Sequence, residues 1–268
     1  MQTNFMKLKI FAILLLSLPY SQQVQAQQNN QLLPFFDNLN NPGSVRFPKG
    51  RVVDITPPAP QLNSFDQAVL QTCGSMGTRV TTNKFKQLLS SHPNVLDKIQ
   101  KASGGELSSG RNSKTEFLED LSNIWFKRRG FEHIFCGEIK GNNGIGGLHF
   151  HGRYLQLQNQ GIAGRLANNQ QREEVIPGVI YTMGVVIKQG NRTIKQPIKG
   201  YSYVSNAEEI LLAGTKAFKR QGNQEGACIY SLKDQETGKI IPSVFVRKER
   251  AIVTFYPDAT PKGTRCKD

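Results

Sequence analysis

The sequence has few of the residues that build metal centres, and it has no apolar stretch long enough to cross a membrane. Its 268 residues include four cysteines and four histidines, and no two cysteines form a CxxC pair. This spacing disfavours a cysteine-based zinc site. The one marked apolar run, residues 10–18, falls well short of the roughly 20 residues that a transmembrane helix needs, so we expect no membrane-embedded segment.

Acidic residues are also scarce. The chain has 20 of them against 34 lysines and arginines, which gives a formal net charge of +14 at pH 7. A charge of this size attracts polyanions such as nucleic acid, anionic lipid or an acidic wall polymer, and does not choose among them. Composition alone therefore leaves a nucleic-acid-binding protein and a generic basic protein equally open.

The first 26 residues have the pattern of a signal peptide. Lys7 and Lys9 precede the apolar run, and small residues around Ala26 mark a cleavage site. We therefore expect a secreted or periplasmic protein, with a net charge of +12 once these two lysines are removed. An oxidising compartment permits one or two disulfides, whose pairing the sequence does not fix. The four cysteines are Cys73, Cys136, Cys228 and Cys266.

The rest of the chain divides by texture into three parts. Residues 27–63 are rich in Gln, Asn and Pro and predict an extended or disordered lead-in. Residues 64–130 show helical spacing of apolar side chains, and residues 131–268 show short runs of β-branched and aromatic residues between turns. The prediction is an α+β fold with an N-terminal helical region and mostly antiparallel sheets after it, in which residues 64–268 form one domain.

Individual elements follow from the same periodicities. We expect helices at residues 64–70, 83–89, 94–101, 114–127 and 206–220, the last with Ser205 as its cap. Strands are expected at residues 132–139, 147–156, 178–188, 201–204, 243–247 and 251–255, with a hairpin turn at residues 189–192.

Three of the four histidines cluster around a turn. His133 lies near the start of one expected strand, and His149 and His151 lie near the start of the next, with a turn-rich stretch at residues 140–144 between them. A hairpin there would bring the imidazoles of His133 and His149 to one face. His92, which precedes Pro93 between two expected helices, is separate from this cluster.

Two adjacent imidazoles suit RNA cleavage by transesterification. One takes the proton from the ribose 2′-OH, and the other gives a proton to the departing 5′-oxygen. The transition state gains negative charge, so a fixed cation is expected nearby, and Lys199 or its near neighbour Lys195 is the candidate. From spacing alone two alternatives stay open: a zinc or copper cluster of the three histidines with Glu138 or Cys136, or a purely structural role.

The residues around these histidines resemble a known family. The stretch from Phe131 to Glu138, with the pattern FEHIFCGE, and the GGLH that ends at His149 resemble the two histidine motifs of the EndoU endoribonucleases. A terminal TFYP that begins at Thr254 resembles the family's last strand. The resemblance extends over about residues 115–260, and it implies an EndoU-like catalytic domain.

The resemblance also implies roles. His149 matches the family's general base, His133 its general acid and Lys199 its catalytic lysine. Tyr256 and Thr254 match residues that line the base pocket. Ser202 or Ser205 matches the serine that contacts uracil. The implied reaction is of the phosphorus–oxygen lyase type: single-stranded RNA is cut at uridines to leave 2′,3′-cyclic phosphate and 5′-OH ends.

Cofactors and partners follow less directly. We expect no metal in the bond-breaking step and therefore no required cofactor, although manganese stimulates some animal members of the family. The competing hypothesis is an exported metal- or polyanion-binding protein without catalysis. If the chain were a toxin module, an immunity protein would be its partner. No role is assigned to His151.

Overall fold

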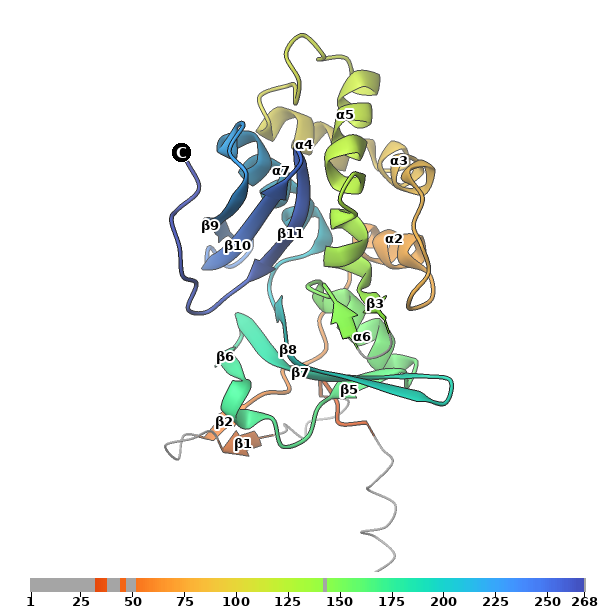
Figure 1. The fold of residues 1–268 in the computed structure, drawn as a ribbon, viewed down its shortest axis with the longest axis vertical. Helices are drawn as coiled ribbons and strands as arrows, with labels where there is room; N and C mark the ends of the chain where they lie inside the picture. The colour runs from red at the N-terminus through yellow and green to blue at the C-terminus, as the bar shows by residue number, and fades with distance from the viewer. Residues whose placement is uncertain (1–31, 38–43, 47–51, 142–143, 268) are drawn as a thin grey trace, which may run out of the picture. The chain divides into compact units, whose positions relative to one another are not determined.

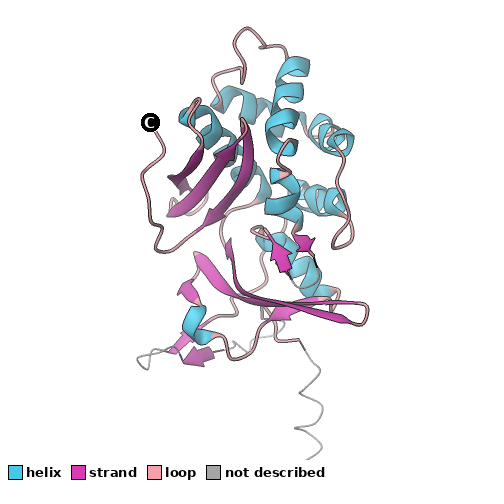
Figure 2. Cartoon of the chain, viewed as in Figure 1, coloured by secondary structure: helices cyan, strands magenta, loops and turns pink. Residues whose placement is uncertain are grey.

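The computed structural model describes residues 32–37, 44–46, 52–141 and 144–267, all within one compact unit, Leu32–Asp268. The expected signal peptide at residues 1–26 lies outside the described residues. The predicted α+β class is confirmed, because helices precede several antiparallel sheets along the chain (Figures 1 and 2). None of the helices in the described ranges is both long and apolar enough to cross a membrane.

The helical region begins with four helices in succession. They are α2 (Ser64–Cys73), α3 (Thr82–Ser90), α4 (Pro93–Ala102) and α5 (Lys114–Phe126). The first and last start at capping boxes, in which an Asn or Ser oxygen and an acidic side chain three residues later satisfy each other's backbone N–H groups. Their apolar faces pack into one core with Trp125, which is fully buried.

The last helix, α7 (Ala207–Gln221), is confirmed where it was expected, but its cap differs. Asn206 accepts the backbone N–H of Glu209, and Ser205 instead bonds the hydroxyl of Ser202. Both α5 and α7 pack against strand β11 (Ala251–Pro257) of a three-stranded antiparallel sheet (Figure 1). That sheet has the order β11–β10–β9, with β10 at Ile240–Lys248 and β9 at Gly226–Lys233.

A second, larger antiparallel sheet is built on the hairpin of β7 (Ile180–Gln189) and β8 (Arg192–Ser202). The expected turn between these strands is confirmed. The other edge of β7 pairs with β6 (Glu174–Ile176) near its start and with β5 (Ala163–Arg165) near its end, and η3 (Gln170–Arg172) lies between those two short strands. This sheet covers a second core that includes the fully buried Tyr154 and Tyr201. Because β8 contacts β11, its end approaches the smaller sheet.

The segments that carry the clustered histidines are not the predicted strands. Residues 132–139 form a π-helical turn, η2 (Glu132–Cys136), followed by the short strand β3 (Glu138–Lys140). Residues 147–156 pass from an irregular stretch into helix α6 (His151–Asn159). The expected hairpin exists only as β3 and β4 (Gly144–Gly146), between the histidines. The composition of residues 132–139 and 147–156, rich in aromatic and β-branched side chains, is typical of strands, but tertiary contacts determine their backbone conformation.

The described parts of residues 27–63 are extended and partly buried. Strand β2 (Val52–Asp54) pairs with β1 (Ser44–Arg46), and Phe35 and Phe36 are fully buried against the core of the large sheet. The side-chain oxygen of Gln158, from α6, accepts the backbone N–H groups of both phenylalanines. The segment therefore contributes to the core of the large sheet.

Two disulfides use all four cysteines. Cys73, at the end of α2, bonds Cys136, at the end of η2, and Cys228 on β9 bonds Cys266 near the C-terminus. The first bridge joins positions 63 residues apart and fixes the end of the turn that contains His133. Cross-links of this kind restrict the unfolded chain and so stabilise the folded one.

Removing the first bridge tests its contribution. We expect Cys73→Ser/Cys136→Ser to lower the free energy of unfolding by about 2–5 kcal/mol, the usual effect of deleting a native disulfide. Urea denaturation followed by circular dichroism measures the loss, with Cys228→Ser/Cys266→Ser as the matched variant. An unchanged unfolding midpoint in the first variant would show that the bridge does not form in solution.

Candidate active site

The two histidine-bearing segments are joined through their backbones. The turn η2 ends at Cys136, so the carbonyls of His133 and Ile134 have no partner further along the helix. They accept the N–H groups of Leu148 and His149, each at 2.8 Å. Gly147 makes this approach feasible: its φ is +59°, and a Cβ there would overlap the carbonyl oxygen of His133. These backbone contacts thus bring the imidazoles of His133 and His149 to the same side of the junction between the two segments.

His133 is held by a carboxylate. Its Nδ1 lies 3.2 Å from Oε2 of Glu138, which belongs to β3. The pKa of Glu138 is lowered, first by the hydrogen bond from His133 and then by the charges of His133, Arg129 and Lys140. Glu138 is therefore ionised at neutral pH and orients the ring through the hydrogen bond at Nδ1. The opposite nitrogen, Nε2, is left for a ligand.

His149 lies in a different environment. Its Nδ1–H donates to the backbone carbonyl of Gly200 on β8 at 3.0 Å, and its ring stacks on Tyr256 with centroids 5.2 Å apart. Burial, followed by the nearby charge of His133, lowers the pKa of His149 well below its ordinary 6.5. The imidazole is therefore neutral at pH 7. Because Nδ1 holds the proton, Nε2 presents a lone pair.

The two rings face a common cavity of about 320 Å³ between the end of β8, β11 and η2. Their centroids are 5.7 Å apart, close enough for groups on both sides of one phosphate to reach them. Only 18% of the His133 side chain is exposed, and His149 is buried except at this opening. The cavity is therefore the route by which a ligand reaches both rings.

Lys199 lines the same cavity from β8. Burial lowers the pKa of its ammonium to about 8, an effect strengthened by Lys140 and opposed by Glu138. Lys195 is exposed and does not line the cavity; four residues earlier on the strand, it starts about 13 Å away. Of the two lysines considered from sequence, Lys199 is the one that lies beside the histidines.

The residues expected to contact a base divide into two groups. Thr254 and Tyr256, from β11, line the cavity, and the Thr254 hydroxyl has no hydrogen-bond partner within the described residues. Ser202 and Ser205 are buried behind His149, with their hydroxyls bonded to each other at 2.8 Å. They border a small gap of about 10 Å³, which His149 and Pro257 also line. The two serines are not among the residues that line the larger cavity.

The metal cluster considered from sequence does not form. Cys136 is in a disulfide, and Nδ1 of His151 faces the backbone carbonyl of Ser202, 3.3 Å away. His151 borders a separate cavity with Asp66 and Tyr203. Nowhere in the described ranges do three His, Cys, Asp or Glu side chains converge in a metal-binding arrangement.

Other residues of the site were not singled out from sequence. Arg129 holds both buried Glu132, at 2.5 Å, and Glu138, at 3.7 Å. Glu174 and Asp258 line the side of the cavity formed by β6 and the end of β11. The sequence offered one signal, since Glu132 and Glu138 both lie in the first histidine motif, but it contains nothing that marks Glu174 or Asp258 as neighbours of His149.

Comparison with known proteins agrees with this geometry. Residues 127–259 match the family model described as bacterial EndoU nuclease, and this range includes both histidines, Lys199 and Tyr256. Through these residues the chain belongs to the EndoU family. No curated protein sequence matches the chain.

Two solved structures resemble this EndoU chain. One is XendoU, described as a splicing-independent snoRNA-processing endoribonuclease: it is 18% identical, covers 88% of this chain and 93% of its own, and has a TM-score of 0.50. The other is the Nsp15 endoribonuclease of Middle East Respiratory Syndrome Coronavirus, 18% identical over 57% of this chain and 41% of its own, with a TM-score of 0.35. The likeness to XendoU shows a shared fold.

The backbone contact at Gly147 yields a direct test. We expect Gly147→Ala to separate the two histidines, because its Cβ cannot occupy the position of the His133 carbonyl oxygen and L-residues disfavour the required φ. Two-dimensional NMR of the imidazole signals should show shifts for both rings. Gly141→Ala is the matched control, since that glycine also has a positive φ but an added Cβ meets nothing. Equal spectra for wild type and Gly147→Ala would contradict the proposed contact.

Proposed function

We propose that this chain is an endoribonuclease that cuts RNA by attack of the ribose 2′-OH on the adjacent phosphorus. The observation that supports this most is the pair of imidazoles at 5.7 Å facing one cavity, with an ammonium beside them. These are the groups that a transesterification needs: a base, an acid and a cation for the developing charge. Membership of the EndoU nuclease family supports the same reaction.

The unequal environments of the two rings assign their roles. His149 is neutral and presents Nε2, so it accepts the proton of the 2′-OH as that oxygen attacks. His133 bonds the Glu138 carboxylate through Nδ1, which leaves Nε2 toward the cavity, so we assign to it the proton that goes to the departing 5′-oxygen. The products would be a 2′,3′-cyclic phosphate and a 5′-OH. Two neighbouring groups with opposed environments are a common basis for acid and base assignments.

Lys199 would stabilise the phosphorane-like transition state. Its ammonium lies in a half-buried position, where a charge interacts more strongly with a phosphoryl oxygen than it would in bulk water. The bond-breaking step requires no metal in this mechanism, because the side chains supply all three functions.

Preference for uridine is the finer part of the proposal. Tyr256 offers a ring on which a base or ribose packs, and the unpartnered hydroxyl of Thr254 can both donate and accept a hydrogen bond. The family resemblance supports a role for Ser202 or Ser205 as well, whose hydroxyls are bonded to each other in this structure. Export is also proposed: the two disulfides favour an oxidising compartment, in agreement with the N-terminal pattern.

The decisive experiment combines substrate and enzyme changes. The protein is incubated with an oligoribonucleotide that contains one uridine, in excess EDTA, and the ends are identified by mass spectrometry. We expect a cyclic phosphate at the uridine, and a loss of about 10²–10⁴-fold in rate for His133→Ala and for His149→Ala, because each removes one proton transfer.

The nucleophile provides the control. Replacing the uridine with 2′-deoxyuridine removes the attacking hydroxyl and should abolish the cut, while replacing it with cytidine tests the base preference alone. Equal cleavage of the deoxy substrate would refute the mechanism. Cleavage at every base with cyclic-phosphate ends would retain the mechanism and refute the preference.

The pH profile tests Lys199. Above a pKa of about 8 its ammonium becomes neutral and the cation is lost, so kcat/KM should fall as the pH rises through about 8. Lys199→Arg keeps its charge across this range, so the alkaline fall should move to higher pH even if the maximal rate is lower. An alkaline limb that is identical in both enzymes would mean that another group titrates there.

A further inference from the structure

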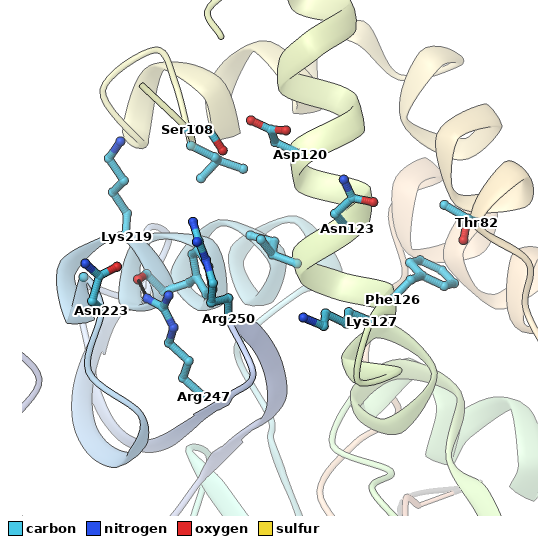
Figure 3. Close-up of a pocket in the computed structure, with 14 residues that line it drawn as sticks. Thr82, Ser108, Asp120, Asn123, Phe126, Lys127, Lys219, Asn223, Arg247 and Arg250 are labelled. Atoms are coloured by element: carbon cyan, nitrogen blue, oxygen red, sulfur yellow. Dashed lines mark hydrogen bonds between the residues drawn. The ribbon is translucent and has the colours of Figure 1, made fainter. Parts of the chain in front are cut away.

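A second cavity, of about 750 Å³, lies away from the histidines. It is bordered by α5, the C-terminal end of α7 and the turn between β10 and β11 (Figure 3). Its volume is within the range of cavities that hold small molecules. The proposed reaction makes no use of it.

Four of the five charged side chains in its lining are basic. Lys127 extends from the end of α5, Lys219 from α7, and Arg247 and Arg250 from the two sides of the β10–β11 turn (Figure 3). Lys219 donates to a backbone carbonyl at 2.7 Å. The side chains of Lys127 and Arg250 are exposed, and across the described ranges no hydrogen bond or ion pair involves them. These two cations are therefore available to a ligand.

Arg247 adds a buried cation to the same wall. Only 3% of it is exposed, and its guanidinium lies 4.2 Å from the centre of the Phe218 ring. One NH group donates to the Phe218 carbonyl at 3.5 Å, and the Glu225 carboxylate is 3.8 Å from Nε, which has no hydrogen bond. A buried donor without a partner is uncommon and calls for an acceptor.

The opposite wall presents an acceptor. Asp120, on α5, is 8% exposed; its Oδ1 accepts from Arg111 at 3.0 Å, but its Oδ2 has no partner within the described residues. A fitting ligand therefore carries anionic oxygens for the cations and an N–H or O–H donor for this carboxylate. A sulfate ion, which carries no proton at neutral pH, satisfies only the first requirement. A nucleotide satisfies both.

We propose that this cavity binds a nucleotide, with its phosphate at Lys127 and Arg250 and a base or ribose donor at Asp120. The nucleotide is either free or part of the RNA strand, and the strand form rests on the proposed function. Strand β11 runs from one cavity to the other, because it starts directly after Arg250 and contains Tyr256. These two residues are about 20 Å apart along the strand. A single strand of roughly six stacked nucleotides, at 3.4 Å each, would span this distance.

The test compares Lys127→Gln/Arg250→Gln with wild type. The first probe is a twelve-nucleotide RNA methylated at every 2′-oxygen, which binds but cannot be cut, and its affinity is measured by fluorescence anisotropy across a salt series. The variant should bind more weakly, with a salt slope reduced by about 0.7, because the two cations hold one phosphate of a single strand. Lys233→Gln/Lys262→Gln removes two exposed charges that do not line the cavity and should leave the slope near that of wild type.

Uridine monophosphate and inorganic phosphate are the second and third probes, and NMR spectra of the full chain measure their binding. Binding of uridine monophosphate that is lost in Lys127→Gln/Arg250→Gln supports the proposal with a free nucleotide as ligand. A reduced salt slope for the twelve-nucleotide RNA, with no binding of uridine monophosphate to wild type, supports the proposal with the RNA strand as ligand. Binding of inorganic phosphate as tight as that of the nucleotide, or no difference between wild type and variant with any probe, overturns the proposal.

Two measurements keep this result separate from the nuclease proposal and from misfolding. A uridine-containing dinucleotide is too short to reach both sites, so wild type and variant should cut it equally. If neither cuts it, the nuclease proposal fails while the binding comparison still decides the role of the cavity.

Arg250→Gly should melt at or above the wild-type temperature, because Arg250 has a φ of +58° that glycine adopts freely, and it should still bind the long RNA more weakly.

Discussion

Two backbone hydrogen bonds hold the proposed active site together. The N–H groups of Leu148 and His149 donate to the carbonyls left free where the π-helical turn ends, at His133 and Ile134. The proximity of the imidazoles therefore depends on main-chain atoms, which any sequence possesses, and on Gly147, whose missing Cβ permits the approach. Around this contact the Cys73–Cys136 bridge fixes the end of the turn, and the pairing of His149 with Gly200 joins it to the large sheet.

The surroundings then make two identical side chains different. One ring faces a carboxylate that Arg129 and Lys140 keep ionised, and the other faces a neutral carbonyl in a buried setting. A histidine carries either role in solution, so the division of labour between acid and base arises from the partner at Nδ1. Glu138 and the carbonyl of Gly200 are in this sense as much part of the chemistry as the imidazoles.

Much of this could be predicted from the sequence, for identifiable reasons. The helix at residues 114–126 and the strands that contain residues 180–188 and 251–255 have local signals, namely an apolar stripe at helical spacing and short β-branched runs, that agree with their packing. Residues 132–139 and 147–156 misled because their composition favours strands while their backbones are fixed by contacts 15 residues away. Strand β9 was not predicted, since it starts at Gly226 and Ala227 and gains its order from β10 and a disulfide.

The motifs predict which residues belong to the site, and the structure places His133, His149, Lys199, Thr254 and Tyr256 around one cavity. The catalytic and base-binding roles of these residues stay predictions. Burial does not follow from motifs, and Ser202 and Ser205 lie behind the imidazole they were expected to accompany. Whether a hydroxyl faces a cavity or a neighbouring hydroxyl depends on the path of the chain from the end of β8 to the start of α7, which no local pattern records.

The glycine contact also limits what protein engineers can transplant. A design that copied only the two imidazoles and the lysine onto another scaffold would omit the main-chain junction that aligns them, because neither Gly147 nor Leu148 contributes through its side-chain chemistry. A successful graft would have to transfer the loop as a rigid unit, together with the end of the π-helical turn that receives it. Catalytic geometry of this kind is a property of the chain's path and not of a list of side chains.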